Sequence, residues 1–127
     1  MEKFITDYVV EYFKSMTSKK KQVNNQTLDE VLQRNLGIKS FTPSGIRSLI
    51  HFIRLNIIIE NEKGEKGWIC GTSEGYYLSY NAVHILEHLN QFESKIRKMM
   101  LIHKKGMSML VDKIYYKQQE LKLNHEN

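Results

Sequence analysis

The clearest pattern of apolar positions lies in the segment Phe41–Asn56. Apolar residues recur there at three- and four-residue steps, at Ile46, Leu49, Ile50 and Ile53. This spacing places them on one face of a helix. Thr42 is a suitable N-cap, and Pro43 suits the first helical position, where its missing N–H costs nothing. The pattern therefore predicts a helix with a defined start and one buried stripe.

The other face of this predicted helix is polar and basic. Its residues are Ser44, Arg47, Ser48, His51 and Arg54. Side chains of these types contact phosphates and base edges in DNA complexes. They are equally typical of a solvated helix face, so this segment alone does not distinguish a DNA-binding face from a solvated one.

Two further helices are predicted before this segment. Aromatic and aliphatic residues at helical spacing predict an amphipathic helix over residues 3–17. Thr27 and Glu30 have the spacing of a capping box, which predicts the start of a short second helix. Gly37 is placed to end that helix in a left-handed conformation, followed by the apolar Ile38.

Two short helices joined by a Gly-containing turn, after a longer helix, have the order of a helix-turn-helix unit. A small helical bundle is the alternative.

The period of the apolar pattern changes after Asn56. Short β-branched and aromatic runs, separated by Gly-containing turns, predict strands at Ile57–Glu60, Trp68–Cys70 and Tyr76–Tyr80. One or two hairpins directly after a helix-turn-helix form a wing. The pattern leaves open whether Ile57–Glu60 pairs with Trp68–Cys70 or only leads to it.

From Asn81 onward the chain is predicted to be helical again. Its apolar positions alternate in three- and four-residue steps, and we expect dimerisation through Leu86, Leu89, Phe92, Ile96, Met99, Met107 and Leu110. The alternative is a helix that folds back on its own domain. Gly106 predicts a kink or break, and the polar end from Lys117 predicts fraying.

These elements predict a mainly α fold with a small β-hairpin wing (α+β), namely a winged helix-turn-helix followed by a long C-terminal helix. We expect residues 1–80 to form the winged helix-turn-helix domain. Residues 81–127 are then the C-terminal helix, a dimerisation element with a frayed end.

Composition narrows the possible classes of protein. The single cysteine, Cys70, excludes an internal disulfide and a cysteine-rich zinc site. No apolar run is long enough to cross a bilayer, and the first residues do not resemble a secretory signal. We therefore expect no membrane partner and a cytoplasmic location, which is the host cytoplasm if the chain is encoded by a phage.

The net charge of +5 favours a polyanionic partner, and its distribution is uneven. Residues 14–54 carry eight basic residues against Asp29 and Glu30, whereas residues 55–80 are acidic overall. The basic residues include the run Lys19–Lys21. Positive charge is thus concentrated around the helix at Phe41–Asn56 and along the C-terminal helix.

Catalytic chemistry finds little support in the sequence. His84 and His88 match one zinc-protease spacing, but no third ligand is evident, and solvent exposure is the simpler explanation for the pair. Cys70 in a predicted strand is typical of buried packing. We expect no enzyme activity, no cofactor and no metal.

The runs SGIRSLIHFIRLN and GWICGTSEGYYLS, followed by a helix with ESKIRKMM, resemble small winged helix-turn-helix proteins of phages and prophages. The resemblance covers about residues 3–110. It implies a DNA-binding regulator of transcription or replication without catalytic residues. The chain departs from that family in the inserted IIENEKGEKG and in its acidic wing, where phosphates would be repelled.

The leading hypothesis is therefore sequence-dependent binding of double-stranded DNA. The expected DNA contacts are Thr42, Ser44, Arg47, Ser48, His51 and Arg54 on the recognition helix, with Lys19, Lys20, Lys21 and Lys39 on the phosphate backbone. Arg54 has the alternative of pairing with an acidic wing residue. A homodimer would place two recognition helices about one helical turn of DNA apart. The rival hypothesis is a protein-binding winged helix, an adaptor or an inhibitor of a host enzyme.

Overall fold

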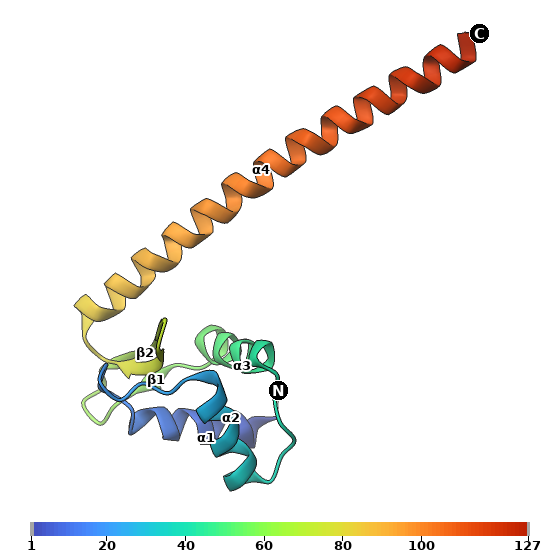
Figure 1. The fold of residues 1–127 in the computed structure, drawn as a ribbon. Helices are drawn as coiled ribbons and strands as arrows, with labels where there is room; N and C mark the ends of the chain where they lie inside the picture. Colours follow the sequence, from blue (N-terminus) through green and yellow to red (C-terminus); the bar gives the residue numbers. More distant parts are fainter. Residues whose placement is uncertain (1, 127) are drawn as a thin grey trace. The chain divides into compact units, whose positions relative to one another are not determined.

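The computed structural model describes the backbone of residues 2–126 and the side chains of residues 2–123. The described residues form three helices, a three-stranded antiparallel sheet and a long C-terminal helix, and Figure 1 colours these elements in chain order. The elements are α1 (Lys3–Lys14), α2 (Asn25–Leu36), α3 (Pro43–Asn56), β1 (Ile59–Glu60), β2 (Lys66–Thr72), β3 (Gly75–Ser79) and α4 (Ala82–Glu126). The predicted α+β fold class, a winged helix-turn-helix followed by a long helix, is confirmed.

The chain divides into two compact units. The first ends at His88, and we call it the head domain; the second begins at Leu89. The head domain contains α1 to α3, the whole sheet and the first two turns of α4. The second unit consists of the rest of α4.

The sheet has the strand order β1-β2-β3. Ile59 lies opposite Gly67 and Glu60 opposite Lys66, so the segment after α3 does pair in the sheet, with the two residues before Trp68. Strands β2 and β3 form a tight hairpin that closes between Thr72 and Gly75. The wing is therefore a meander in which β2 is central.

The segment between α1 and α2 extends the sheet beyond β3. Val23 and Tyr76 exchange both backbone hydrogen bonds, with N···O distances of 2.9 and 2.8 Å. The Leu78 amide also donates to the Met16 carbonyl at 2.9 Å. The free edge of β3 is thereby paired, which joins the helical half of the domain to the wing.

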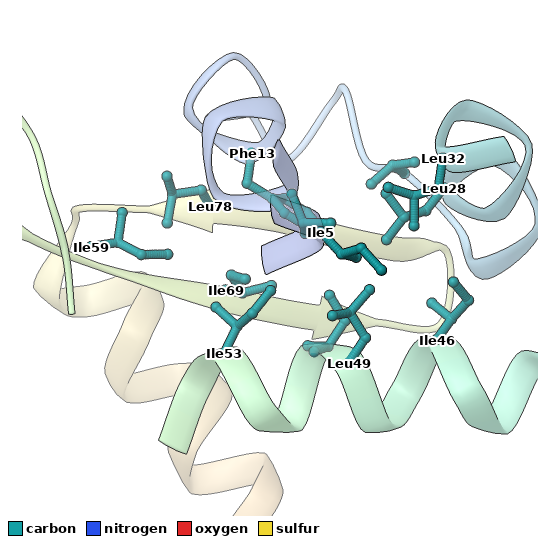
Figure 2. Close-up of a cluster of buried hydrophobic side chains, with 13 residues drawn as sticks. Ile5, Phe13, Leu28, Leu32, Ile46, Leu49, Ile53, Ile59, Ile69 and Leu78 are labelled. Atoms are coloured by element: carbon teal, nitrogen blue, oxygen red, sulfur yellow. The ribbon is translucent and has the colours of Figure 1, made fainter. Parts of the chain in front are cut away.

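One apolar cluster holds the head domain together. Figure 2 shows Ile46, Leu49 and Ile53 pointing from α3 into a core shared with α1, α2 and the two long strands. The other members that the figure labels are Ile5, Phe13, Leu28, Leu32, Ile59, Ile69 and Leu78. The predicted stripe of α3 is confirmed, because Ile46, Leu49, Ile50 and Ile53 are all buried.

Several predicted boundaries also hold. Thr42 caps α3 by accepting a hydrogen bond from the Gly45 amide at 3.0 Å, and Pro43 is the first helical residue. Gly37 ends α2 with φ of 63°, in the left-handed region that favours glycine. Ile38 packs against the core after it, as the cap motif predicts.

Three predictions about the helices were wrong. Helix α1 ends at Lys14 rather than at residue 17, because Met16 leaves the helix to accept the bond from β3. The start of α2 is capped by Asn24, whose side chain accepts from the Thr27 amide at 2.8 Å, so Thr27 is already helical. The predicted break near Gly106 is not seen, since α4 is one continuous helix.

Helix α4 begins where the Asn81 side chain accepts a hydrogen bond from the Val83 amide at 2.9 Å. It is helical through Glu126, so the fraying predicted from Lys117 is not seen, and Asn127 lies outside the described residues. Every side chain from Leu89 to Leu123 is exposed. Within the described part of the chain, no helix combines the length and apolarity needed to cross a membrane.

Gly75 offers a test of the pairing between Val23 and Tyr76. Its φ is +143°, and an added Cβ would lie 2.5 Å from the Val23 carbonyl oxygen. We expect Gly75→Ala to lower the free energy of unfolding by more than about 2 kcal/mol, because both the backbone conformation and the clash oppose it. Urea denaturation followed by Trp68 fluorescence measures the change.

Gly64→Ala is the matched control for this prediction. Gly64 has φ of +76° but open space around a Cβ, so only the conformational cost of about 1 kcal/mol applies. Equal losses in the two variants would contradict a structural role for the close approach at Gly75.

Candidate nucleic-acid interface

The exposed face of α3 carries the residues predicted to contact DNA. Ser44, Arg47, Ser48 and His51 are exposed, opposite the buried stripe. Ser44 and Thr42 share a hydrogen bond between their hydroxyl groups, at 3.0 Å. The first three turns of α3 thus present hydroxyl, guanidinium and imidazole groups on one outward surface, which we call the α3 face.

Asp29 fixes the turn that leads into α3. Its two carboxylate oxygens accept hydrogen bonds from the Ser40 hydroxyl and the Phe41 amide, both at 2.7 Å, and Gln33 donates to the same carboxylate at 3.0 Å. Hydrogen bonds to a charged group are stronger than those between neutral groups. The carboxylate therefore ties α2 to the chain just before the N-cap of α3, and Lys39 is exposed in this turn.

The three consecutive lysines lie in a loop that we call the lysine loop, residues 17–22. The Lys21 amide donates to the Ser18 carbonyl at 2.9 Å, and the Gln22 side chain donates to the Lys19 carbonyl at 2.8 Å. The Gln22 amide oxygen in turn accepts from the Thr72 hydroxyl at the tip of the wing. The loop is thus held beside β3 and the wing tip, with Lys19, Lys20 and Lys21 exposed.

Arg54 does not belong to the outward α3 face. Its Nε and Nη2 atoms donate to the Ile69 carbonyl at 2.9 and 2.7 Å, and its guanidinium carbon lies 5.8 Å from the centre of the Trp68 ring. Burial lowers the pKa of this guanidinium, partly offset by nearby Tyr76 and Cys70. Arg54 therefore connects the end of α3 to the central strand through a backbone carbonyl.

Tyr76 connects the wing with the basic residues of α3. It stands opposite Gly71 on β2, and the Arg54 Nη2 atom approaches the same glycine. Burial raises the pKa of the Tyr76 phenol, while the positive charges of Arg54 and Arg47 act in the opposite direction. Tyr76 is therefore a neutral hydrogen-bonding group at the border between the wing and the α3 face.

The acidic residues of the wing are divided between its two ends. Glu60, Glu62 and Glu65 flank the connection between β1 and β2, where Asn61 organises the turn through hydrogen bonds to the Lys63 and Glu65 amides. The wing tip at the far end of β2 carries only Glu74. At about 3.3 Å per residue, β2 separates the two ends by roughly 20 Å. Most of the negative charge thus lies away from the wing tip.

The two histidines at the start of α4 have different environments. His84 is exposed, whereas His88 is buried and its Nδ1 atom accepts a hydrogen bond from the Trp68 indole at 3.1 Å. The expected solvent exposure of the pair was therefore wrong for His88. Among the described residues, no group of three or more histidine, cysteine or acidic side chains has the geometry of a metal site.

Cys70 is buried in β2, as predicted. It pairs across the sheet with Tyr77, and burial raises the pKa of its thiol. A thiol with a raised pKa is a poor nucleophile at neutral pH.

Sequence reasoning missed Asn24, Asp29 and Tyr76. Asn24 was a visible N-cap candidate, since asparagine is favoured at that position. Asp29 binds Ser40 and Phe41, 11 and 12 positions away, and Tyr76 pairs with Val23, 53 positions away. The local pattern holds no signal for such contacts.

Comparison of the chain with protein-family models, with curated proteins and with solved structures returned no match.

Substitution of the two arginines of α3 by alanine should affect the free energy of unfolding to different extents. Arg54→Ala removes two charge-assisted hydrogen bonds and a ring contact, so we expect it to lower the free energy of unfolding by about 1.5–3 kcal/mol. Arg47→Ala changes an exposed side chain and should stay within about 0.5 kcal/mol of the parent protein. Urea denaturation of the three proteins measures both effects, and a neutral Arg54→Ala would contradict the structural role of Arg54.

Proposed function

We propose that this protein binds double-stranded DNA in a sequence-dependent manner through the α3 face. The observation that carries the proposal is the exposed row of Ser44, Arg47, Ser48 and His51 on a helix whose other side is fully buried. A helix of this kind, the second of a helix-turn-helix, fits the major groove of B-DNA, where base edges present a distinct pattern for each base pair.

Arg47 is the residue best suited to read a base. Its side chain is exposed and lies three residues beyond Ser44 and one before Ser48, so short hydroxyl groups flank a long bidentate donor. Arginine commonly donates two hydrogen bonds to a guanine edge. Thr42 contributes mainly as the N-cap, and its part in binding is to hold the first turn that carries Ser44.

Phosphate contacts are assigned to the exposed lysines. Lys39 precedes α3 in the turn held by Asp29, and Lys19, Lys20 and Lys21 extend from the lysine loop beside the wing tip. Such contacts add affinity without sequence information and weaken as salt is added. The separation of Glu60, Glu62 and Glu65 from the wing tip reduces the repulsion that the acidic wing would otherwise exert.

Arg54 is left out of the proposed contact set. Its guanidinium already binds the Ile69 carbonyl and lies over Trp68, and moving it to a phosphate would undo the junction between α3 and β2. In biological terms, DNA binding of this kind fits a regulator of transcription or replication, as the resemblance to the phage-type proteins implies.

A gel-shift assay on mixed-sequence duplex, repeated over a range of salt concentrations, tests the proposal. We expect Arg47→Ala to weaken binding by about ten- to hundredfold on a preferred sequence. Lys20→Ala should weaken all sequences alike and reduce the slope of log affinity against log salt by about one.

Lys63→Ala is the matched control, because Lys63 is an exposed lysine in the acidic β1–β2 connection. It should leave binding unchanged. No retention of the parent protein even at low salt would refute DNA binding and favour the protein-binding adaptor. Equal retention of the parent, Arg47→Ala and Lys20→Ala proteins would refute the proposed surface.

A further inference from the structure

Beyond His88, α4 carries an apolar stripe with an eleven-residue repeat. The repeat contains four positions on one side of the helix, and each position occurs three times at steps of eleven residues. The four sets are Leu89, Met100 and Val111; Phe92, His103 and Ile114; Ile96, Met107 and Gln118; and Met99, Leu110 and Leu121. Ten of these twelve side chains are apolar, and those ten are between 39% and 69% exposed. We call this surface the α4 stripe.

The length of the repeat determines the direction of the stripe relative to the helix axis. Eleven residues complete three helical turns at about 3.67 residues per turn, close to the 3.6 of a straight α-helix. The α4 stripe therefore runs nearly parallel to the helix axis. Two such helices can pack along their whole length without the left-handed supercoil that a seven-residue repeat imposes.

The α4 stripe is large enough for a stable interface with one other helix. From Leu89 to Leu121 it extends for about 50 Å, and a contact about 10 Å wide gives a footprint of roughly 500 Å² per copy before side chains interdigitate. A biological interface needs about 500 Å² or more per partner. A second copy of the same helix suits the stripe, because two-fold symmetry matches one apolar surface with itself.

The charges of α4 distinguish the two possible orientations. The segment 95–105 contains five basic residues and no acidic residue. In a parallel pair these segments would face each other, and ten positive charges would lie within about 15 Å along the axis. In an antiparallel pair centred between Met107 and Ser108, the segment 95–105 faces the segment 110–120, which holds two basic and two acidic residues.

We propose that α4 pairs with α4 of a second copy in antiparallel orientation, with the two-fold axis between Met107 and Ser108. Glu93 then lies level with Lys122 of the partner subunit, on the same flank of the stripe, and symmetry forms this ion pair twice. Glu93 keeps its own bond to Arg97, at 2.6 Å. This pairing is independent of DNA binding by the α3 face.

Charge exchange between Glu93 and Lys122 tests the orientation. In the full chain at low salt, Glu93→Lys and Lys122→Glu should each raise the dimer dissociation constant about three- to tenfold, because each places like charges together twice. The double variant should return to within about twofold of the parent protein. Lys105→Glu, on the side of the helix away from the stripe, is the control for net charge and should change little.

Sedimentation equilibrium measures these constants. In a parallel pair, positions 93 and 122 lie too far apart to interact, so the double variant would show no rescue and the proposal would fail. A parent protein that stays monomeric at about 100 μM, or one that is monomeric and co-sediments with vesicles containing anionic phosphatidylserine, would also overturn it. The latter result would assign the stripe to a membrane surface.

Single cysteines give a second measurement that does not depend on charge. Met107→Cys, next to the axis, should form a disulfide-linked dimer under mild oxidation. Leu89→Cys should not, because the two copies of residue 89 would lie about 55 Å apart. The natural Cys70 is buried in the sheet and does not interfere. Efficient cross-linking of Leu89→Cys would establish the parallel arrangement and overturn the proposal.

Discussion

Burial of one stripe of α3 determines which residues this protein can offer to a partner. Ile46, Leu49 and Ile50 have no exposed surface, and Ile53 is almost completely buried. Rotating the helix by one residue would place apolar side chains in water and polar ones in the core, at a cost of several kcal/mol. The position of Arg47 on the outside is therefore a consequence of the core. Arg54, at the end of the same helix, secures that rotation by binding the Ile69 carbonyl.

The features that the sequence predicted correctly depend on near neighbours in the chain. The stripe of α3, its cap at Thr42 and the left-handed Gly37 each follow from a few adjacent residues. The features that it missed depend on distant ones. Asn24 rather than Thr27 caps α2 because Val23 is held in extended conformation by Tyr76, 53 residues further along. Arg54 and Ile69 meet only once the sheet has formed.

The candidate site follows the same division. The outward row from Ser44 to His51 was predictable, since it is the complement of the buried stripe. The anchoring of the preceding turn by Asp29 was not, and neither was the separation of the acidic residues to the two ends of the wing. Both depend on how the turn and the sheet are arranged in space. Residue types alone therefore predicted the residues of the α3 face. The contacts that hold this face in place became clear only from the fold.

An antiparallel α4 pair would also change the geometry expected on DNA. The attachment points at Leu89 would lie about 55 Å apart, compared with about 34 Å between half-sites on adjacent turns of one face.

The contact between Trp68 and His88 gives the head domain an internal optical signal. Trp68 is the single tryptophan of the chain, and its indole N–H donates to the imidazole Nδ1 of His88, in the second turn of α4. That nitrogen must be unprotonated to accept the bond. The emission of one indole thus reports whether the beginning of α4 rests on the sheet, without any added dye or label. Undocking of α4 can then be followed through this emission in the unmodified protein.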